Sequence, residues 1–254
     1  MTPGAFRVLV VSFMEKRRQG ILAEIAAMKT AHFFVPLLLA APFFTGISKS
    51  EPFVDPGFVL SVHTPGTWTY FLRQLPVKAA PVLDYRGKPV AHQSKAAGIL
   101  PYDVGTRDLQ QCADALMRLR AEYLFAQGRH EEIAFRFVSG EWFRYKDYIK
   151  GRRPRNSSVR AGGAAPLPVT HATLRAYLDI VYTYSSTLSL HRDLLPASGF
   201  AIGTVIITPR SPGHCTMIVD EMVNPKGEKR YKLVESFMPA QSIYVLRNEE
   251  DGSF

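Results

Sequence analysis

A cysteine and a histidine, about a hundred residues apart, are the residues of this sequence whose types and surroundings best suggest a chemistry. Cys112 lies in QQCADALMRLRAEYL, residues 110–124, and His214 lies in SPGHCTMIVD, residues 211–220. A thiol becomes a strong nucleophile when it is held as a thiolate, and an imidazole can take its proton and return it. The two motifs therefore predict a cysteine nucleophile site, with Cys112 as the nucleophile and His214 as the base.

A carboxylate is the predicted third member of this site. Glu235 lies in LVESF, on a strand that should pair with the histidine strand through a turn at residues 225–227. From there Glu235 can accept a hydrogen bond from the imidazole and fix its tautomer. Gln241 is a second candidate for this orienting role.

A helix is expected to position the cysteine. Asp108 can cap this helix, with Gln111 in the capping-box position, which places Cys112 about four residues inside it. The partial positive charge of a helix N-terminus would favour the thiolate. The alternative is a purely structural residue, because Cys112 falls on the apolar face of the helix and free cysteines are often buried.

The histidine and the carboxylate are expected on an antiparallel sheet. A strand at 131–139 and a second helix, from Thr170 to about residue 190, precede four strand-like segments at 203–208, 215–219, 230–236 and 242–246. A basic, Gly- and Pro-rich stretch at 151–168 is predicted to be a flexible loop. This order predicts an α+β fold in which the cysteine-bearing helix packs on a small antiparallel β-sheet.

The second cysteine of the chain, Cys215, offers a rival reading. Successive residues of a strand point to opposite faces, so Cys215 should face away from Cys112 if His214 faces it. A disulfide between Cys112 and Cys215 would need the opposite orientation, and a metal site built from all three residues meets the same difficulty. The sequence leaves the disulfide open, and we predict neither a metal nor a cofactor.

The composition sets wider limits. The chain has 254 residues, of which 46% are hydrophobic and 21% charged, as in a globular protein. Its formal net charge of +9 favours polyanions in general. No zinc-finger, RNP or helix-turn-helix pattern is present, so specific nucleic-acid binding is not expected. Two cysteines exclude a disulfide-dense scaffold.

The beginning of the chain resembles an export signal. From Met28 a lone Lys29 precedes an apolar run, residues 31–47, and a polar exit follows. Residues 1–50 are therefore interpreted as an upstream extension plus a signal peptide or N-terminal anchor, with translation starting at Met1 or at Met28. Residues 51–254 are predicted to form a single domain that is periplasmic or extracellular, with membrane contact only through an uncleaved N-terminal segment.

Three stretches of the sequence resemble one family. Residues 105–124, 211–220 and 236–241 resemble the bacterial exported proteins of domain-of-unknown-function family 4846. A more distant resemblance is to NlpC/P60 and CHAP-type hydrolases, and it implies a papain-like fold and cleavage of peptide or amide bonds in cell-wall peptides. It also implies Cys112 as nucleophile, His214 as base and Glu235 as orienting group. Cys215 departs from the small apolar residue expected after the histidine.

These observations leave three functions open. The first is a papain-like cysteine hydrolase that acts on cell-wall peptides or a related amide. The second is a non-catalytic exported binding or structural domain on the same scaffold. The third is an acyltransferase that uses the same cysteine and histidine. The separation and orientation of Cys112 and His214 discriminate between the catalytic and the non-catalytic readings.

Overall fold

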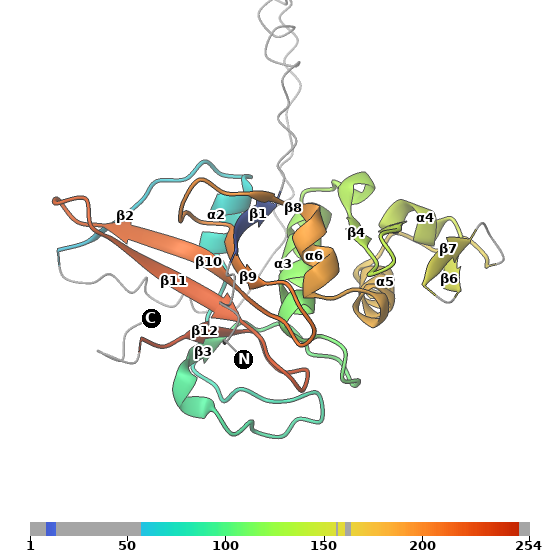
Figure 1. The fold of residues 1–254 in the computed structure, drawn as a ribbon, viewed down its shortest axis with the longest axis horizontal. Helices are drawn as coiled ribbons and strands as arrows, with labels where there is room; N and C mark the ends of the chain where they lie inside the picture. The colour runs from blue at the N-terminus through green and yellow to red at the C-terminus, as the bar shows by residue number, and fades with distance from the viewer. Residues whose placement is uncertain (1–8, 14–56, 156, 161–163, 249–254) are drawn as a thin grey trace, which may run out of the picture.

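The computed structural model contains one large antiparallel β-sheet, built mainly from strands in the C-terminal part of the chain (Figure 1). The structure describes residues 9–13, 57–155, 157–160 and 164–248. Within these residues the sheet has eight strands in the order β3-β12-β11-β10-β9-β1-β8, with β2 also paired to β10. The strands are β1 (Leu9–Phe13), β2 (Val59–Leu60), β3 (Ala96–Ile99), β8 (Leu194–Pro196), β9 (Thr204–Thr208), β10 (His214–Val223), β11 (Lys229–Glu235) and β12 (Tyr244–Leu246).

The long β10–β11 hairpin forms where the sequence predicts it. The Asn224 side-chain oxygen accepts hydrogen bonds from the backbone N–H groups of Lys226 and Glu228, which closes the turn. Gly227 has φ of +82°, a left-handed conformation that costs glycine little. The hairpin sets His214 at the start of one strand and Glu235 at the end of the next.

Helix α3 (Cys112–Ala126) packs between this sheet and two other helices. It touches β10 and β11 on one side, and α5 (His171–Tyr184) and α6 (Thr187–Asp193) on the other. Neighbours on both sides bury residues all round the helix, including Arg118 and Arg120. The single apolar face expected from the sequence is therefore too narrow a description of this helix.

The predicted helix from Thr170 to about residue 190 is two helices. Thr170 caps α5 as expected, because its hydroxyl accepts a hydrogen bond from the Thr173 N–H. The chain then breaks at Ser185 and Ser186, and the Ser186 hydroxyl caps α6 by accepting from the Leu188 N–H. Serine side chains that bond the backbone compete with helix continuation, which explains the break.

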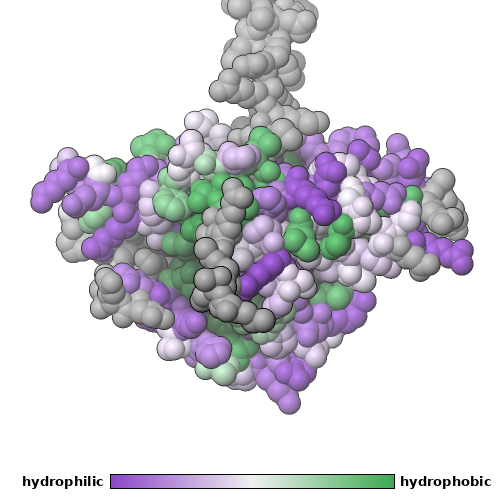
Figure 2. Space-filling model, viewed as in Figure 1, coloured by the Kyte–Doolittle hydropathy of each residue, from purple (hydrophilic) through white to green (hydrophobic). Residues whose placement is uncertain are grey.

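Most of the remaining elements lie beyond α5 and α6, whereas α2 packs against β10 and η1 directly precedes β3. In Figure 1 the β10–β11 hairpin extends to one side of the molecule, and α4, α5 and the β6–β7 hairpin extend to the other. These elements are α2 (Trp68–Arg73), η1 (Gln93–Lys95), η2 (His130–Glu132), β4 (Ala134–Arg136), β5 (Trp142–Arg144), α4 (Tyr145–Ile149), β6 (Arg153–Arg155) and β7 (Ser158–Arg160). Figure 2 shows hydrophilic residues at these outer ends and hydrophobic residues toward the middle of the same face.

Two predictions about loops and boundaries are corrected. The described part of the predicted flexible loop 151–168 contains the β6–β7 hairpin. Residues 9–13, which the sequence analysis left outside the fold, form β1 between β9 and β8. Val11 is 3% exposed, and the Phe13 ring meets the Trp68 ring edge-on at 6.0 Å. The local sequence of a short apolar strand does not show which strands it pairs with, so β1 is recognised only in the assembled sheet.

The predicted secretory segment, from residue 28 to about 51, lies outside the described residues. Within the described part of the chain, none of the helices combines the length and the apolar character needed to cross a membrane. The fold class is confirmed as a mixture of helices with an antiparallel sheet, on which the cysteine-bearing helix packs. The sheet is larger than the four strands predicted.

Candidate functional site

Cys112 is the first residue of helix α3. The prediction that Cys112 lies about four residues inside the helix, with Asp108 as the cap, is wrong. The Asp108 carboxylate instead accepts hydrogen bonds from the Ala240 N–H at 2.6 Å and the Gln111 side chain at 3.0 Å. Gln111 takes the cap position, and its own N–H donates to the Asp114 carboxylate at 3.1 Å. The sulfur therefore sits where a helix carries unpaired N–H groups, which favours a thiolate.

His214 is held by Glu235, as the sequence predicts. The Nε2 atom of His214 lies 2.8 Å from Oε2 of Glu235. The other carboxylate oxygen, Oε1, accepts a hydrogen bond of 2.5 Å from the Tyr244 hydroxyl. Phe237 covers the imidazole, with its ring centroid 5.3 Å from that of His214. Both oxygens of Glu235 are engaged, so the imidazole is fixed in one orientation.

Gln241, the second candidate for the orienting role, bonds elsewhere. Its backbone carbonyl accepts a hydrogen bond from the Ser236 hydroxyl, and its backbone pairs with Asp84. Tyr244, which the sequence analysis did not single out, completes the site through Glu235. Its place opposite Glu235 in the β11–β12 register is the signal that could have identified it.

The thiol and the imidazole shift each other's titration. The pKa of Cys112 falls to about 5, chiefly through a hydrogen bond from the Cys215 thiol and then, against the effect of burial, through the His214 imidazole. The pKa of His214 rises to about 9, because it interacts first with Cys112 and then with Glu235. Between these values, a thiolate and an imidazolium are the favoured pair.

The contact between these two groups is loose. The Cys112 thiol points to the Gly213 carbonyl, 3.7 Å away, and Nδ1 of His214 is buried without a well-aligned hydrogen bond. The electrostatic interaction between the thiolate and the imidazolium depends on the distance between them and does not require an aligned hydrogen bond. Hydrogen bonds between nucleophile and base are often long before a substrate binds.

Cys215 corrects the alternation argument of the sequence analysis. Alternation predicts that His214 and Cys215 do not both face Cys112, yet both lower the pKa of its thiol. Alternation fixes the direction of each Cα–Cβ bond, whereas the imidazole at the first position of a strand has additional reach. Both cysteines are free thiols, so the disulfide is absent from this state.

Gly213 places the histidine and has no room for a side chain. A Cβ atom there would lie 2.1 Å from the Thr187 hydroxyl and 2.6 Å from the carbonyl oxygens of Thr208 and Arg210. The Thr187 hydroxyl also donates to the Arg210 carbonyl at 2.9 Å, which ties α6 to this turn. Neither the tight fit of Gly213 nor the role of Thr187 is visible in the local sequence.

Two cavities meet at the site. His214 and Glu235 line a cavity of about 780 Å³, and Cys112 lines a smaller one of about 220 Å³. Met238 borders both, and it is 42% exposed, as is its neighbour Phe237. Met238 therefore separates the two cavities, and a ligand would reach the thiol from one side of this residue and the imidazole from the other.

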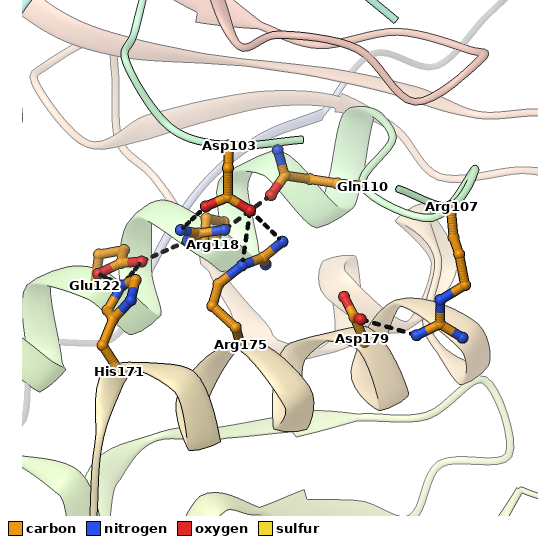
Figure 3. Close-up of polar contacts among 8 residues, drawn as sticks. All are labelled: Asp103, Arg107, Gln110, Arg118, Glu122, His171, Arg175 and Asp179. Atoms are coloured by element: carbon orange, nitrogen blue, oxygen red, sulfur yellow. Dashed lines mark hydrogen bonds and ion pairs between the residues drawn. The ribbon is translucent and has the colours of Figure 1, made fainter. Parts of the chain in front are cut away.

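A polar network fixes the helix that carries the thiol (Figure 3). The Arg118 guanidinium is 1% exposed and donates to Gln110, Asp103 and Glu122. From α5, Arg175 bonds the same Asp103 carboxylate at 2.9 Å, and His171 lies 2.8 Å from Glu122. These contacts tie α3 to α5 beside the residues that precede Cys112. The sequence analysis missed Arg118, although an arginine inside an apolar helix face is itself a signal.

No group of three or more His, Cys, Asp or Glu side chains in the described ranges is arranged to hold a metal ion. The Cys215 thiol, which is 1% exposed, makes the largest contribution to the lowered pKa of Cys112. The chemistry that this arrangement offers is that of an activated thiol.

Comparison with known proteins places the chain in one family. No curated protein matches it, and no solved structure matches it. The family model described as domain of unknown function (4846) matches residues 51–254, a range that includes Cys112, His214 and Glu235. Since this match covers most of the sequence, the chain belongs to the family of domain of unknown function 4846.

Proposed function

We propose that the protein is a cysteine hydrolase of the papain-like type that cleaves peptide or amide bonds. One observation carries the proposal: a helix-start thiol and a carboxylate-held imidazole interact where two cavities meet. The Cys112 pKa of about 5 and the His214 pKa of about 9 favour the reactive pair at neutral pH.

The reaction would begin with attack of the Cys112 thiolate on the substrate carbonyl. The backbone N–H of Cys112, at the first position of α3, is a donor for the developing oxyanion. Proton transfer from His214 to the leaving amine breaks the amide bond and leaves an acyl group on the sulfur. A water molecule, deprotonated by His214, then attacks the thioester and releases the acid and the thiolate.

Glu235 acts through the imidazole. Its bond to Nε2 leaves Nδ1 as the nitrogen that exchanges the proton with Cys112 and the leaving group. The negative charge of Glu235 stabilises the imidazolium that forms after the thiol proton is taken.

The substrate class belongs to the same proposal. The scaffold is proposed to be related to NlpC/P60-type hydrolases, because a cysteine at a helix start packs on an antiparallel sheet that carries the histidine and its partner. The apolar run at residues 31–47 with its charged start supports export of the protein. A cell-wall peptide would then lie across Met238, with its scissile bond at Cys112 in the cavity of about 220 Å³ and the rest of the chain in the cavity of about 780 Å³.

The test is hydrolysis of purified cell-wall peptides by the wild type and by Cys112→Ala. We expect new amine termini with the wild type and none with the variant, while the variant keeps its affinity for uncleaved peptide. Equal cleavage by both proteins would refute the role of Cys112. Binding without cleavage by the wild type would favour a non-catalytic binding domain on the same scaffold.

A further inference from the structure

The two thiols of this chain lie where helix α3 packs against strand β10. Cys112 and Cys215 are its only cysteines, and both are reduced. The Cys215 side chain is 1% exposed and lies on β10, against which α3 packs. The Cys112 sulfur is 3.7 Å from the carbonyl oxygen of Gly213, two residues before Cys215. In the proposed hydrolysis Cys215 lowers the pKa of Cys112 but forms and breaks no bond itself.

The two sulfurs differ in access and in reactivity. Cys112 lines the cavity of about 220 Å³, so a molecule as small as a hydroperoxide can reach it. Its position at a helix start and beside His214 favours the thiolate, which is the form that peroxides oxidise. Cys215 lines neither of the two cavities and is 1% exposed, against 7% for Cys112. The neighbouring Cys112 and then burial raise the pKa of Cys215, which keeps it a thiol.

We propose that Cys112 and Cys215 form a peroxide-responsive pair, in which Cys112 is oxidised first and Cys215 then closes a disulfide with it. In the first step the Cys112 thiolate attacks one oxygen of the hydroperoxide, the O–O bond breaks, and the other oxygen leaves as hydroxide or alkoxide. The sulfur becomes a sulfenic acid. In the second step the Cys215 sulfur attacks the Cys112 sulfur, the S–O bond breaks, and the hydroxyl leaves as water with the Cys215 proton.

The structure favours closure of this bond. A disulfide requires the sulfurs to approach to ~2.05 Å, and the Cys112 sulfur already contacts the backbone of Gly213, two residues before Cys215 on the same stretch of chain. Cys112 is the first residue of α3, and its thiol donates one weak hydrogen bond, to the Gly213 carbonyl at 3.7 Å. The disulfide would remove the thiolate reversibly and would protect Cys112 from oxidation to sulfinic acid. This inference does not depend on the proposed hydrolysis, because it concerns the thiols alone.

The experiment treats the full-length protein with increasing hydrogen peroxide, alkylates the remaining thiols with iodoacetamide, and maps the peptides by mass spectrometry. For the wild type we expect a peptide pair joined through Cys112 and Cys215, and full recovery of Cys112 labelling after dithiothreitol. For Cys215→Ala we expect sulfinic acid at Cys112, with labelling that dithiothreitol does not restore.

The wild-type result alone can overturn the proposal, whatever the stability of the variant. Accumulation of Cys112 sulfinic acid in the wild type without the joined peptides would overturn it, and so would resistance of Cys112 to peroxide. A disulfide that forms in a protein without hydrolytic activity would support the pair while the proposed function fails, so the two outcomes are distinguishable.

Discussion

Replacing His214 by glutamine tests whether an imidazolium activates the Cys112 thiol. The variant His214→Gln keeps a polar side chain of similar size and removes the charge. In the wild type the pKa of Cys112 is about 5, against an ordinary value of 9.0. His214 contributes to this lowering by hydrogen bonding and by charge, after the larger contribution of the Cys215 thiol.

The expected change follows from these values. At pH 6 a thiol with a pKa of about 5 is ~90% thiolate, whereas an ordinary thiol is ~0.1% thiolate. A neighbouring opposite charge shifts a pKa by ~1–3 units. Cys215 and the helix start remain in the variant, so the Cys112 pKa should rise to ~6–8. The thiolate fraction at pH 6 then falls to between ~50% and ~1%, and alkylation slows by ~2- to ~100-fold.

The assay is the rate of iodoacetamide alkylation between pH 4 and pH 9, with peptide mapping to separate Cys112 from Cys215. A matched control is His171→Gln, because His171 pairs with Glu122 at 2.8 Å, the same separation as in the His214–Glu235 pair, on the surface between α3 and α5. The control should keep the wild-type profile. If His214→Gln also kept it, or if wild-type Cys112 reacted at pH 6 like an ordinary thiol, the ion-pair reasoning would be refuted.

Four further changes test other parts of the site. In Glu235→Gln the His214 pKa should fall from about 9, so the imidazolium is lost at lower pH and the alkaline limb of the hydrolysis rate moves toward neutral pH. In Gly213→Ala the added Cβ clashes with neighbouring oxygens, the closest 2.1 Å away, which should lower the melting temperature and slow Cys112 alkylation; an unchanged melting curve would contradict this. Arg118→Met removes a buried charge and leaves Asp103 and Glu122 without this partner, so the free energy of unfolding measured in urea should fall by ~3 kcal/mol. Val11→Asp, at a position 3% exposed, should destabilise the fold by more than ~2 kcal/mol if β1 belongs to the sheet, and no change would exclude that strand.

Much of the local structure could be predicted from residue patterns. The apolar periodicity around Cys112 predicts α3, and the turn residues 225–227 predict the β10–β11 hairpin. The turn brings the end of β11 close to the start of β10, so it places Glu235 near His214 along the chain. A register shift between Ile218 and Asp220 then decides that Glu235 lies on the same face of the sheet as His214, and the turn residues do not predict that shift.

Other features depend on contacts between distant residues. Asp108 looks like the helix cap, but its carboxylate bonds the Ala240 N–H, which is far along the chain, and the helix begins at Cys112 instead. Strand β1 forms by pairing with β8 and β9, which lie far from it in the sequence. No local pattern contains these partners.

The sequence by itself determined which residues can do chemistry: one thiol near a helix start, one histidine at a strand start and one glutamate on the next strand. Residue type and short-range spacing are enough for that, because helices, strands and turns form over a few residues. Only the tertiary structure decided that Cys112 is the first residue of its helix and that both His214 and Cys215 lower the pKa of its thiol. Whether distant side chains meet depends on how helix and sheet pack, and packing is a property of the whole chain.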